Sequence, residues 1–132
     1  MLRTPACDVL GIEVPVVQAA IWPATSPALV AAVSEAGGLG SVGSVFESAE
    51  SIQRQIARVR ELTERPFAVN HVVPLLDEEA FEATLEAKPA VVSLALGDPG
   101  YLVERAHAVG QRSSTRSTRW GRPVGSRNWA SM

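Results

Sequence analysis

Residues 67–96 read FAVNHVVPLLDEEAFEATLEAKPAVVSLAL, and this stretch decides the fold class. Its two ends, 67–73 and 90–96, are rich in apolar and β-branched residues and are predicted strands. Between them Asp77 opens a helical segment with two glutamates in its first turn, where the helix dipole favours negative charge. Pro89 ends that helix because proline cannot continue the hydrogen-bonding pattern. The stretch is therefore a strand–helix–strand unit.

Similar units extend toward both termini. The predicted strands are 14–21, 38–44, 67–73 and 90–96. The predicted helices begin after the N-cap residues Ser26, Ser48, Asp77 and Asp98. A strand starts about every 25–30 residues, which suits a parallel α/β architecture. Four βα units are about half of an eight-fold barrel of ~250 residues, whereas a doubly wound sheet closes with roughly that many strands. The count alone leaves both architectures open.

The segment 38–43 reads GLGSVG and matches the glycine spacing of a dinucleotide-binding loop. In that motif the glycines end a strand and open a helix, so that the pyrophosphate meets the helix N-terminus. Here they follow a helix and lie within a predicted strand, which is the reverse order. We therefore interpret them as a helix stop followed by a strand that packs closely against its neighbours.

Composition limits the class of protein. The chain has 132 residues, of which 46% are hydrophobic and 20% are charged, as in ordinary globular domains. No run reaches the ~20 apolar residues of a membrane helix, and the N-terminus has no signal-like apolar segment. A single cysteine, Cys7, excludes a disulfide framework and a cysteine-based zinc site, and it has no basic neighbour that would activate it. We expect a cytoplasmic protein that contacts no membrane.

Polar residues at strand ends are the candidates for a site. Asn70 and His71 close the third predicted strand, where barrel enzymes place functional groups. Because neighbours on a strand face opposite sides, His71 is expected to point away from the side that Asn70 faces. Gln18 lies inside an apolar run that ends at Trp22, which is consistent either with a surface for a flat ligand or with an ordinary connection. His107 lies between alanines of the last helix and is expected at the surface.

Five segments in this order resemble the nitronate monooxygenase family, FMN-dependent barrels formerly called 2-nitropropane dioxygenases. The matching segments are 10–18, 26–40, 62–70, 91–99 and 102–110. The resemblance covers residues 8–110 almost without interruption and favours the barrel over the doubly wound sheet. It implies the N-terminal half of a (β/α)8 TIM barrel, with a partial barrel domain over 1–110.

The resemblance also implies which residues contact the flavin. The matching positions are Ala20, Ile21, Trp22 and Asn70. The first three would line the flavin ring, although the family usually has proline where Ala20 stands, and Asn70 would contact it from the end of the third strand. The family's catalytic histidine follows a glycine-rich segment beyond the fourth strand, and neither His71 nor His107 matches it. No catalytic residue and no metal ligand are therefore assigned.

The family's activity follows from the same resemblance. Its members oxidise alkyl nitronates with dioxygen: the flavin takes up the substrate's electrons, the carbon becomes a carbonyl and nitrite is released. The expected partners are a small nitronate and dioxygen. The flavin phosphate sits on loops late in the barrel, so we expect this chain to be truncated and inactive, with little bound FMN. A flavin-dependent enoyl reductase, which shares the barrel, is the alternative enzyme.

Residues 111–132 differ from the rest and are predicted to form a disordered tail. They contain 5 arginines and no acid, whereas 1–110 contain 7 basic and 14 acidic residues. When 110–120 are back-translated with GC-rich codons, a one-base shift gives ATVIHQVHTV and continues as GQARREPELGVD. That is the strand, cap and helix expected of a fifth βα unit. We hypothesise a frameshift near Gly110.

Two non-enzymatic alternatives remain. Arginines interleaved with Trp120 and Trp129 could grip phosphates and stack on bases, but a frameshift in a GC-rich gene produces arginine and tryptophan anyway. We therefore expect no nucleic-acid partner. A half-barrel with unpaired strand edges could also complete itself by pairing with a second copy or a separate partner chain.

Overall fold

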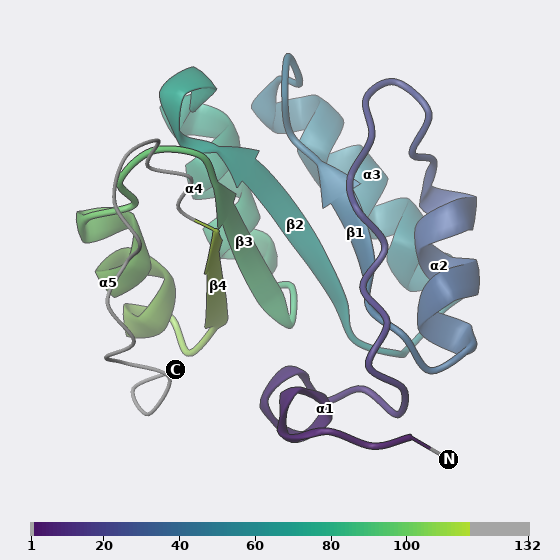
Figure 1. Ribbon diagram of the computed structural model, residues 1–132. Helices are drawn as coiled ribbons and strands as arrows, with labels where there is room; N and C mark the ends of the chain where they lie inside the picture. The colour runs from purple at the N-terminus through teal and green to yellow at the C-terminus, as the bar shows by residue number, and fades with distance from the viewer. Residues whose placement is uncertain (1, 117–132) are drawn as a thin grey trace.

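A computed structural model describes residues 2–116, and its strands form one parallel sheet (Figure 1). The strands are β1 (Gly40–Gly43), β2 (Phe67–Val72), β3 (Val91–Ala95) and β4 (Arg112–Arg116). They lie in sequence order across the sheet, β1-β2-β3-β4, with each one parallel to the next. Consecutive order without a reversal is the pattern of a barrel wall and differs from the doubly wound sheet, whose order reverses at a switch point.

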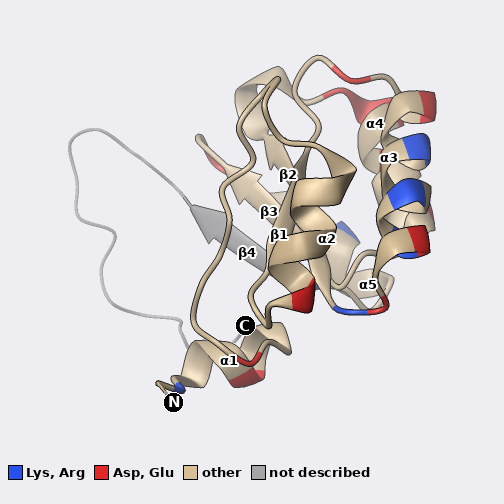
Figure 2. Cartoon of the chain, turned by 90° about the vertical axis from the view of Figure 1, so that its right-hand side faces the viewer, with Lys and Arg blue, Asp and Glu red and all other residues tan. Residues whose placement is uncertain are grey.

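The longer helices cover one face of this sheet. The helical elements are α1 (Pro5–Leu10), α2 (Pro27–Glu35), α3 (Ala49–Leu62), the 3-10 turn η1 (Val73–Leu75), α4 (Glu78–Ala87) and α5 (Tyr101–Ala108). Figure 2 shows α3 and α4 stacked on one side of the strands, while the N-terminal segment runs along the other side. Helices on the outside only are the arrangement of a TIM barrel, so the structure agrees with the predicted fold class.

Three of the predicted helix caps are present, and apolar side chains form the core between helices and sheet. Ser26, Ser48 and Asp77 each accept a hydrogen bond from a backbone N–H in the first turn of the following helix, as N-caps do. One core cluster joins α2, α3, α4, β1 and β2 and consists of Val30, Val42, Ile52, Ile56, Val59, Phe67, Val69 and Ala80. A second joins α4, β3 and α5 and consists of Phe81, Leu85, Val92, Leu94, Leu102 and Ala106.

The glycine-rich segment serves packing, as predicted. A Cβ placed at Gly40 would lie 2.1 Å from the carbonyl oxygen of Val30, so only glycine lets α2 approach β1 this closely. The segment follows α2 and forms β1 itself, and no helix starts from its glycines. The motif does not open a nucleotide-binding helix.

The amino ends of the strands are sealed by α1, a helix that the sequence analysis did not identify. Its six residues carry no long apolar stripe, so local pattern gives little signal for it. Cys7 of α1 is fully buried, and it clusters with Ile12, Leu39, Ala68 and Val91. The helix therefore closes the inner side of the sheet at its amino end.

The predicted first strand, 14–21, is wrong. In its place lies an extended segment that makes only an isolated parallel bridge, Val17 to Leu39, beside β1. Pro15 has no N–H to donate to a ladder. Two backbone bonds surround this bridge, from the Gln18 N–H to the Leu39 carbonyl and from the Leu39 N–H to the Val16 carbonyl, both at 2.9 Å. The side chain of Gln18 adds a further link, because the Ser41 N–H donates to Gln18 Oε1 at 2.9 Å.

The chain after Gly110 also differs from the expectation of a wholly disordered tail. Arg112–Arg116 forms β4, in register with β3 from Val91 to Ala95. Parallel pairing uses only backbone N–H and C=O groups, so the exposed edge of β3 can recruit a segment without apolar residues. The rest of the predicted tail, 117–132, lies outside the described residues.

The last helix begins later than predicted. Gly100 is its N-cap, and Asp98 accepts a hydrogen bond from the Gly100 N–H at 3.0 Å without bonding the helix itself. The positive φ of Gly100, 41°, turns the chain into the helix and favours glycine there.

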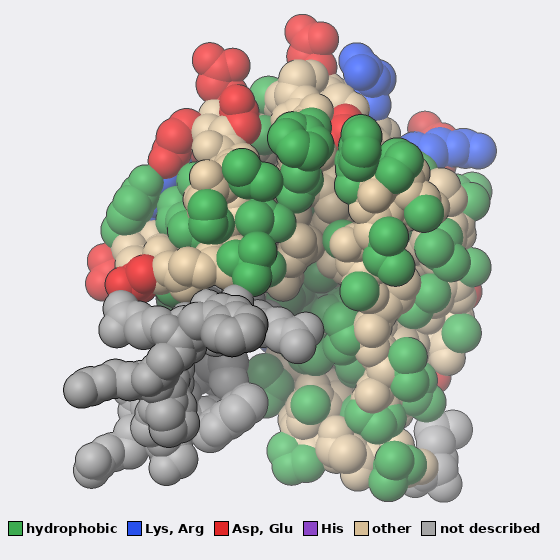
Figure 3. All heavy atoms as spheres, turned by 45° about the horizontal axis from the view of Figure 1, so that its top comes forward, with side chains coloured by type: hydrophobic (Ala, Val, Ile, Leu, Met, Phe, Trp, Pro, Cys, Tyr) green, Lys and Arg blue, Asp and Glu red, His purple; other side chains and the backbone are tan. Residues whose placement is uncertain are grey.

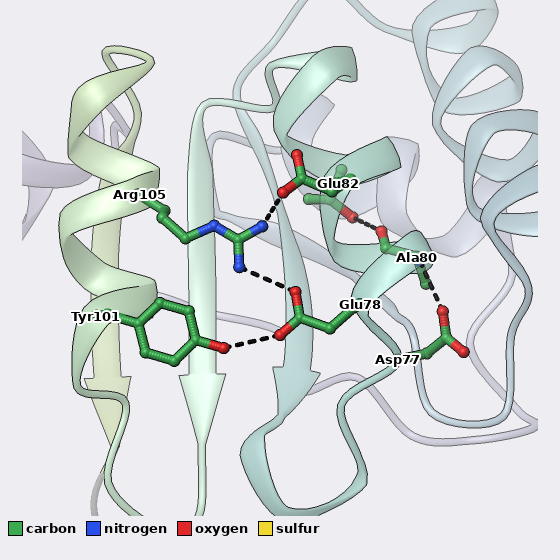
Figure 4. Close-up of polar contacts among 7 residues, drawn as sticks. Asp77, Glu78, Ala80, Glu82, Tyr101 and Arg105 are labelled. Carbon is green, nitrogen blue, oxygen red and sulfur yellow. Dashed lines mark hydrogen bonds and ion pairs between the residues drawn. The ribbon is translucent and has the colours of Figure 1, made fainter.

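A polar clamp fastens α5 to α4 on the outer surface (Figure 4). The Arg105 guanidinium donates to the carboxylates of Glu78, at 2.9 Å, and Glu82. The Tyr101 hydroxyl donates to Glu78 at 2.8 Å, and the Arg105 guanidinium also lies 4.9 Å from the Phe81 ring centroid. The bond from Arg105 lowers the pKa of Glu78, and the bond to Glu78 raises the pKa of Tyr101.

Candidate functional site

Three residues at the carboxyl ends of neighbouring strands line up across the inner face of the sheet. The register pairs Gly43 of β1 with Asn70 of β2, and Asn70 with Ser93 of β3. All three are half-buried, on the face that the helices leave uncovered. The Ser93 hydroxyl donates to Asn70 Oδ1 at 3.0 Å. Because this bond occupies the amide oxygen, the Asn70 side chain is oriented to offer its N–H groups to a ligand.

The segment containing Gln18 lies beside this row and is held by its own polar side chains. Gln18 Nε2 lies 3.4 Å from both the Ser41 carbonyl and the Thr25 hydroxyl. The Ile21 N–H donates to Thr25 Oγ1 at 2.8 Å. Gln18 therefore performs a structural task in this segment.

The residues that the family resemblance assigns to this segment differ in how far they are buried. Ala20 is half-buried and packs toward β1, since a Cβ at Gly43 would lie 3.3 Å from the Ala20 Cβ. Ala20 and Asn70 are thus both neighbours of Gly43. Ile21 and Trp22 are 61% and 57% exposed, so their side chains are available at the surface of the segment.

A residue that the sequence analysis missed, Phe46, completes this edge. It follows β1, is 76% exposed, and lies edge-to-face on Trp22 with ring centroids 5.6 Å apart. Its φ of 61° is left-handed, which costs a residue other than glycine about 1 kcal/mol. Leu96, after β3, shares this conformation with a φ of 60° and is 46% exposed. Strained exposed residues at strand ends mark functional edges in barrel enzymes.

Hydrophobic side chains spread over this end of the molecule. Figure 3 brings the carboxyl ends of the strands toward the viewer and shows the apolar side chains across the exposed face, with charged ones along its upper margin. We call this surface the carboxyl-end edge and define it by Ile21, Trp22, Phe46, Asn70 and Leu96. It combines an apolar rim with one oriented amide, which suits a flat, largely apolar ligand that has a few acceptor atoms.

Neither histidine reaches this edge. His71 is 1% exposed and faces α4, on the side opposite Asn70, as strand alternation predicts. Burial lowers its pKa to about 4, so the ring is neutral at pH 7. His107 is exposed on α5, as expected. The fully buried Cys7 lies at the opposite end of the sheet.

Residues 2–116 contain neither a candidate metal site nor a candidate membrane-spanning helix. No group of three or more His, Cys, Asp or Glu side chains there could hold a metal ion. No helix in this part of the chain is long and apolar enough to cross a membrane.

Comparison with known proteins gives one family. The nitronate monooxygenase profile matches residues 3–111. A probable nitronate monooxygenase of Staphylococcus saprophyticus is 41% identical over 73 residues, which are 55% of this chain and 21% of that protein. One from Staphylococcus aureus is 42% identical over 67 residues, 51% of this chain and 19% of its own length. The chain thus spans about a fifth of the curated relatives it matches.

Solved structures show the same architecture. FabK from Thermotoga maritima superposes with a TM-score of 0.82 and 31% identity, over 87% of this chain and 37% of that one. A nitroalkane oxidase from Streptomyces ansochromogenes superposes with a TM-score of 0.73 and 24% identity, over 85% of this chain and 42% of that one. At 24% identity, the similarity to the nitroalkane oxidase supports the fold alone.

Proposed function

Because this chain belongs to the nitronate monooxygenase family, we propose that its carboxyl-end edge is the ring-facing part of an FMN site. The observation that carries the proposal is the row Gly43–Asn70–Ser93, beside which Ala20 packs. Small side chains in this row leave room for a planar ring, and Asn70 offers N–H donors to its acceptor atoms. Ile21 and Trp22 would cover the ring's edge.

The proposed activity of the whole protein is the oxidation of alkyl nitronates by dioxygen to a carbonyl compound and nitrite. Bound FMN would supply the electron-accepting chemistry and the reaction with dioxygen. The described residues would bind and orient the ring and exclude water from it through the apolar rim. Since His71 faces α4, it supplies no general base at the edge. The proposed partners are a small nitronate and dioxygen, and the proposed location is the cytoplasm.

A comparison of two ligands tests the proposal. The family resemblance implies that the flavin phosphate is held by loops late in the barrel, so the ring-facing part alone should not sense the phosphate. We expect the 132-residue chain to bind FMN weakly and to bind riboflavin with the same affinity within about twofold. The readout is flavin fluorescence during titration with protein. FMN bound at one equivalent after purification would contradict the expected weak binding, and riboflavin failing to bind where FMN binds would contradict the ring-facing assignment.

We further propose that the reading frame changes near Gly110. The family match ends at residue 111, which supports a boundary there. Arg112–Arg116 occupies the place of the next barrel strand, where the back-translated shifted frame would encode a more apolar segment. Resequencing the gene from 90–96 through several hundred bases past the stop codon tests this. A shifted frame that soon meets stop codons would refute it. The proposed absence of nucleic-acid binding concerns 117–132, outside the described residues.

A further inference from the structure

His71 links three elements from within the core. It is 1% exposed, and its ring lies edge-to-face on Phe81 of α4 with centroids 5.2 Å apart. Its Nδ1 lies 2.8 Å from the hydroxyl of Ser44, which follows β1. Its Nε2 lies 3.0 Å from the hydroxyl of Thr84 in α4. Both hydroxyl residues are buried, Ser44 at 8% and Thr84 at 0% exposure, so each hydroxyl needs a partner inside the protein.

The positions of the protons follow from the donors available. The hydroxyl of Thr84 has one proton, which it donates to the Ala80 carbonyl at 2.9 Å. Toward His71 it must therefore accept, so Nε2 carries the ring proton. Neutral imidazole has one N–H, which leaves Nδ1 as an acceptor for the Ser44 proton. The donor order runs from Ser44 through His71 and Thr84 to Ala80.

Ser44 connects this chain of bonds to the carboxyl-end edge. Its N–H donates to the Asn70 carbonyl at 3.0 Å, and its own carbonyl accepts from the Glu47 N–H at 3.1 Å. The turn closed by the second bond contains Phe46, whose left-handed backbone places the ring on Trp22. Since that conformation is strained, surrounding contacts must hold it. The Ser44 hydroxyl bond to His71 is the side-chain anchor of this turn in the core.

We infer that His71 is a positioning residue: as the Nε2–H tautomer it anchors Ser44 to α4 and thereby holds Phe46 against Trp22 at the carboxyl-end edge. Its value for ligand binding rests on the proposed function, but the tautomer and the aromatic contact do not require a flavin. An apolar residue of similar size would leave the Ser44 hydroxyl without its side-chain partner and the Thr84 hydroxyl bonded to the Ala80 carbonyl alone. Neutral histidine, with an acceptor and a donor on opposite sides of its ring, bonds both hydroxyls.

Nitrogen NMR of the ¹⁵N-labelled 132-residue chain tests the tautomer. The sequence has two histidines, so His107→Gln assigns the His71 ring in long-range ¹H–¹⁵N spectra. At pH 7 we expect a protonated Nε2 and an unprotonated Nδ1. Thr84→Val removes the acceptor of Nε2–H, and we expect the proton to move to Nδ1, where Ser44 then accepts it. An Nδ1–H tautomer in the unaltered chain, or no response to Thr84→Val, would overturn the inference.

Contacts between Phe46 and Trp22 test the positioning role. In ligand-free protein, we expect Ser44→Ala to reduce nuclear Overhauser effects between these rings at least twofold. The matched control is Ser34→Ala, which also removes a fully buried hydroxyl, one that accepts from the Gly40 N–H at 3.2 Å. Ser34→Ala should leave the ring contact intact. Equal losses in both variants, or none in Ser44→Ala, would refute positioning by His71. Failure of flavin to bind would count against the proposed function alone.

Discussion

The two ends of the sheet are built in opposite ways. At the amino end, α1 covers the inner face, and Cys7 and Ile12 are buried with Ala68 and Val91. At the carboxyl end, Trp22 and Phe46 are exposed, and polar side chains occupy the inner face. A barrel uses its amino end for stability and its carboxyl end for ligands. The difference indicates that one end of this structure contributes to folding and the other is available for binding.

Two isoleucines offer the sharpest test of that difference. Ile12 is 4% exposed at the amino end, whereas Ile21 is 61% exposed at the carboxyl-end edge. Ile12→Ala should lower the free energy of unfolding by about 2–5 kcal/mol, because it empties a packed site. Ile21→Ala should change it by less than about 0.5 kcal/mol. Urea denaturation of both variants measures this, and similar losses would remove the distinction between the ends.

The next largest effect is expected from pH. His71 has a pKa of about 4 when folded and 6.5 as its ordinary value, so the unfolded chain binds its proton first as pH falls. The neutral His71 ring therefore contributes fully to the free energy of unfolding above pH 6.5. This contribution, about 3 kcal/mol, is lost as the pH falls from 6.5 to about 4. Denaturation at pH 7 and pH 4.5 measures the loss. In His71→Gln the pH dependence should be shallower, and an unchanged slope would contradict a buried neutral imidazole.

A smaller effect is expected at the α4–α5 clamp, on the outer surface away from both ends of the inner face. Arg105→Ala should lower the free energy of unfolding by about 1 kcal/mol, through lost packing and the contact with the Phe81 ring. Arg54→Ala is the control, because its guanidinium is 72% exposed and lies 3.9 Å from Glu50. In thermal unfolding, the melting temperature of Arg105→Ala should be clearly lower than that of Arg54→Ala. Equal melting temperatures would show that the clamp adds nothing.

The smallest effect on stability should accompany a specific effect on binding. Asn70→Ala removes the amide at the carboxyl-end edge and should weaken riboflavin binding about 3- to 10-fold, the value of one hydrogen bond. Ser93→Ala removes the hydrogen bond to the Asn70 oxygen but keeps the N–H donors of Asn70, so the loss of riboflavin affinity should be smaller. Fluorescence titration compares them. If Asn70→Ala binds like the unaltered chain, the amide does not contact the ring.

Local chemistry explains which parts of the fold were predictable. Ser26, Ser48 and Asp77 cap their helices through bonds to the next turn, so the sequence nearby contains the whole signal. Strand β4 depends on the edge of β3, a partner that no local pattern in Arg112–Arg116 specifies. The segment 14–21 was predicted as a whole strand, but its backbone pairing is limited to the bonds around the Val17–Leu39 bridge, and the Gln18 side chain supplies the next link to β1.

The candidate site shows the same division. Alternation along a strand correctly placed Asn70 and His71 on opposite faces. The exposure and left-handed backbone of Phe46 depend on Ser44, His71 and the position of Trp22, which come from separate parts of the chain. A large apolar residue between a strand end and the Ser48 cap was the one available signal.

Backbone NMR during a riboflavin titration tests the central claim most directly, because it compares both ends of the sheet in one experiment. We predict shift changes at the carboxyl-end edge, at Ile21, Trp22 and Asn70, with Cys7 and Ile12 unchanged, and the same pattern with FMN. Changes concentrated at the amino end, or changes at neither end with millimolar riboflavin, would contradict the assignment of the carboxyl-end edge as the flavin site.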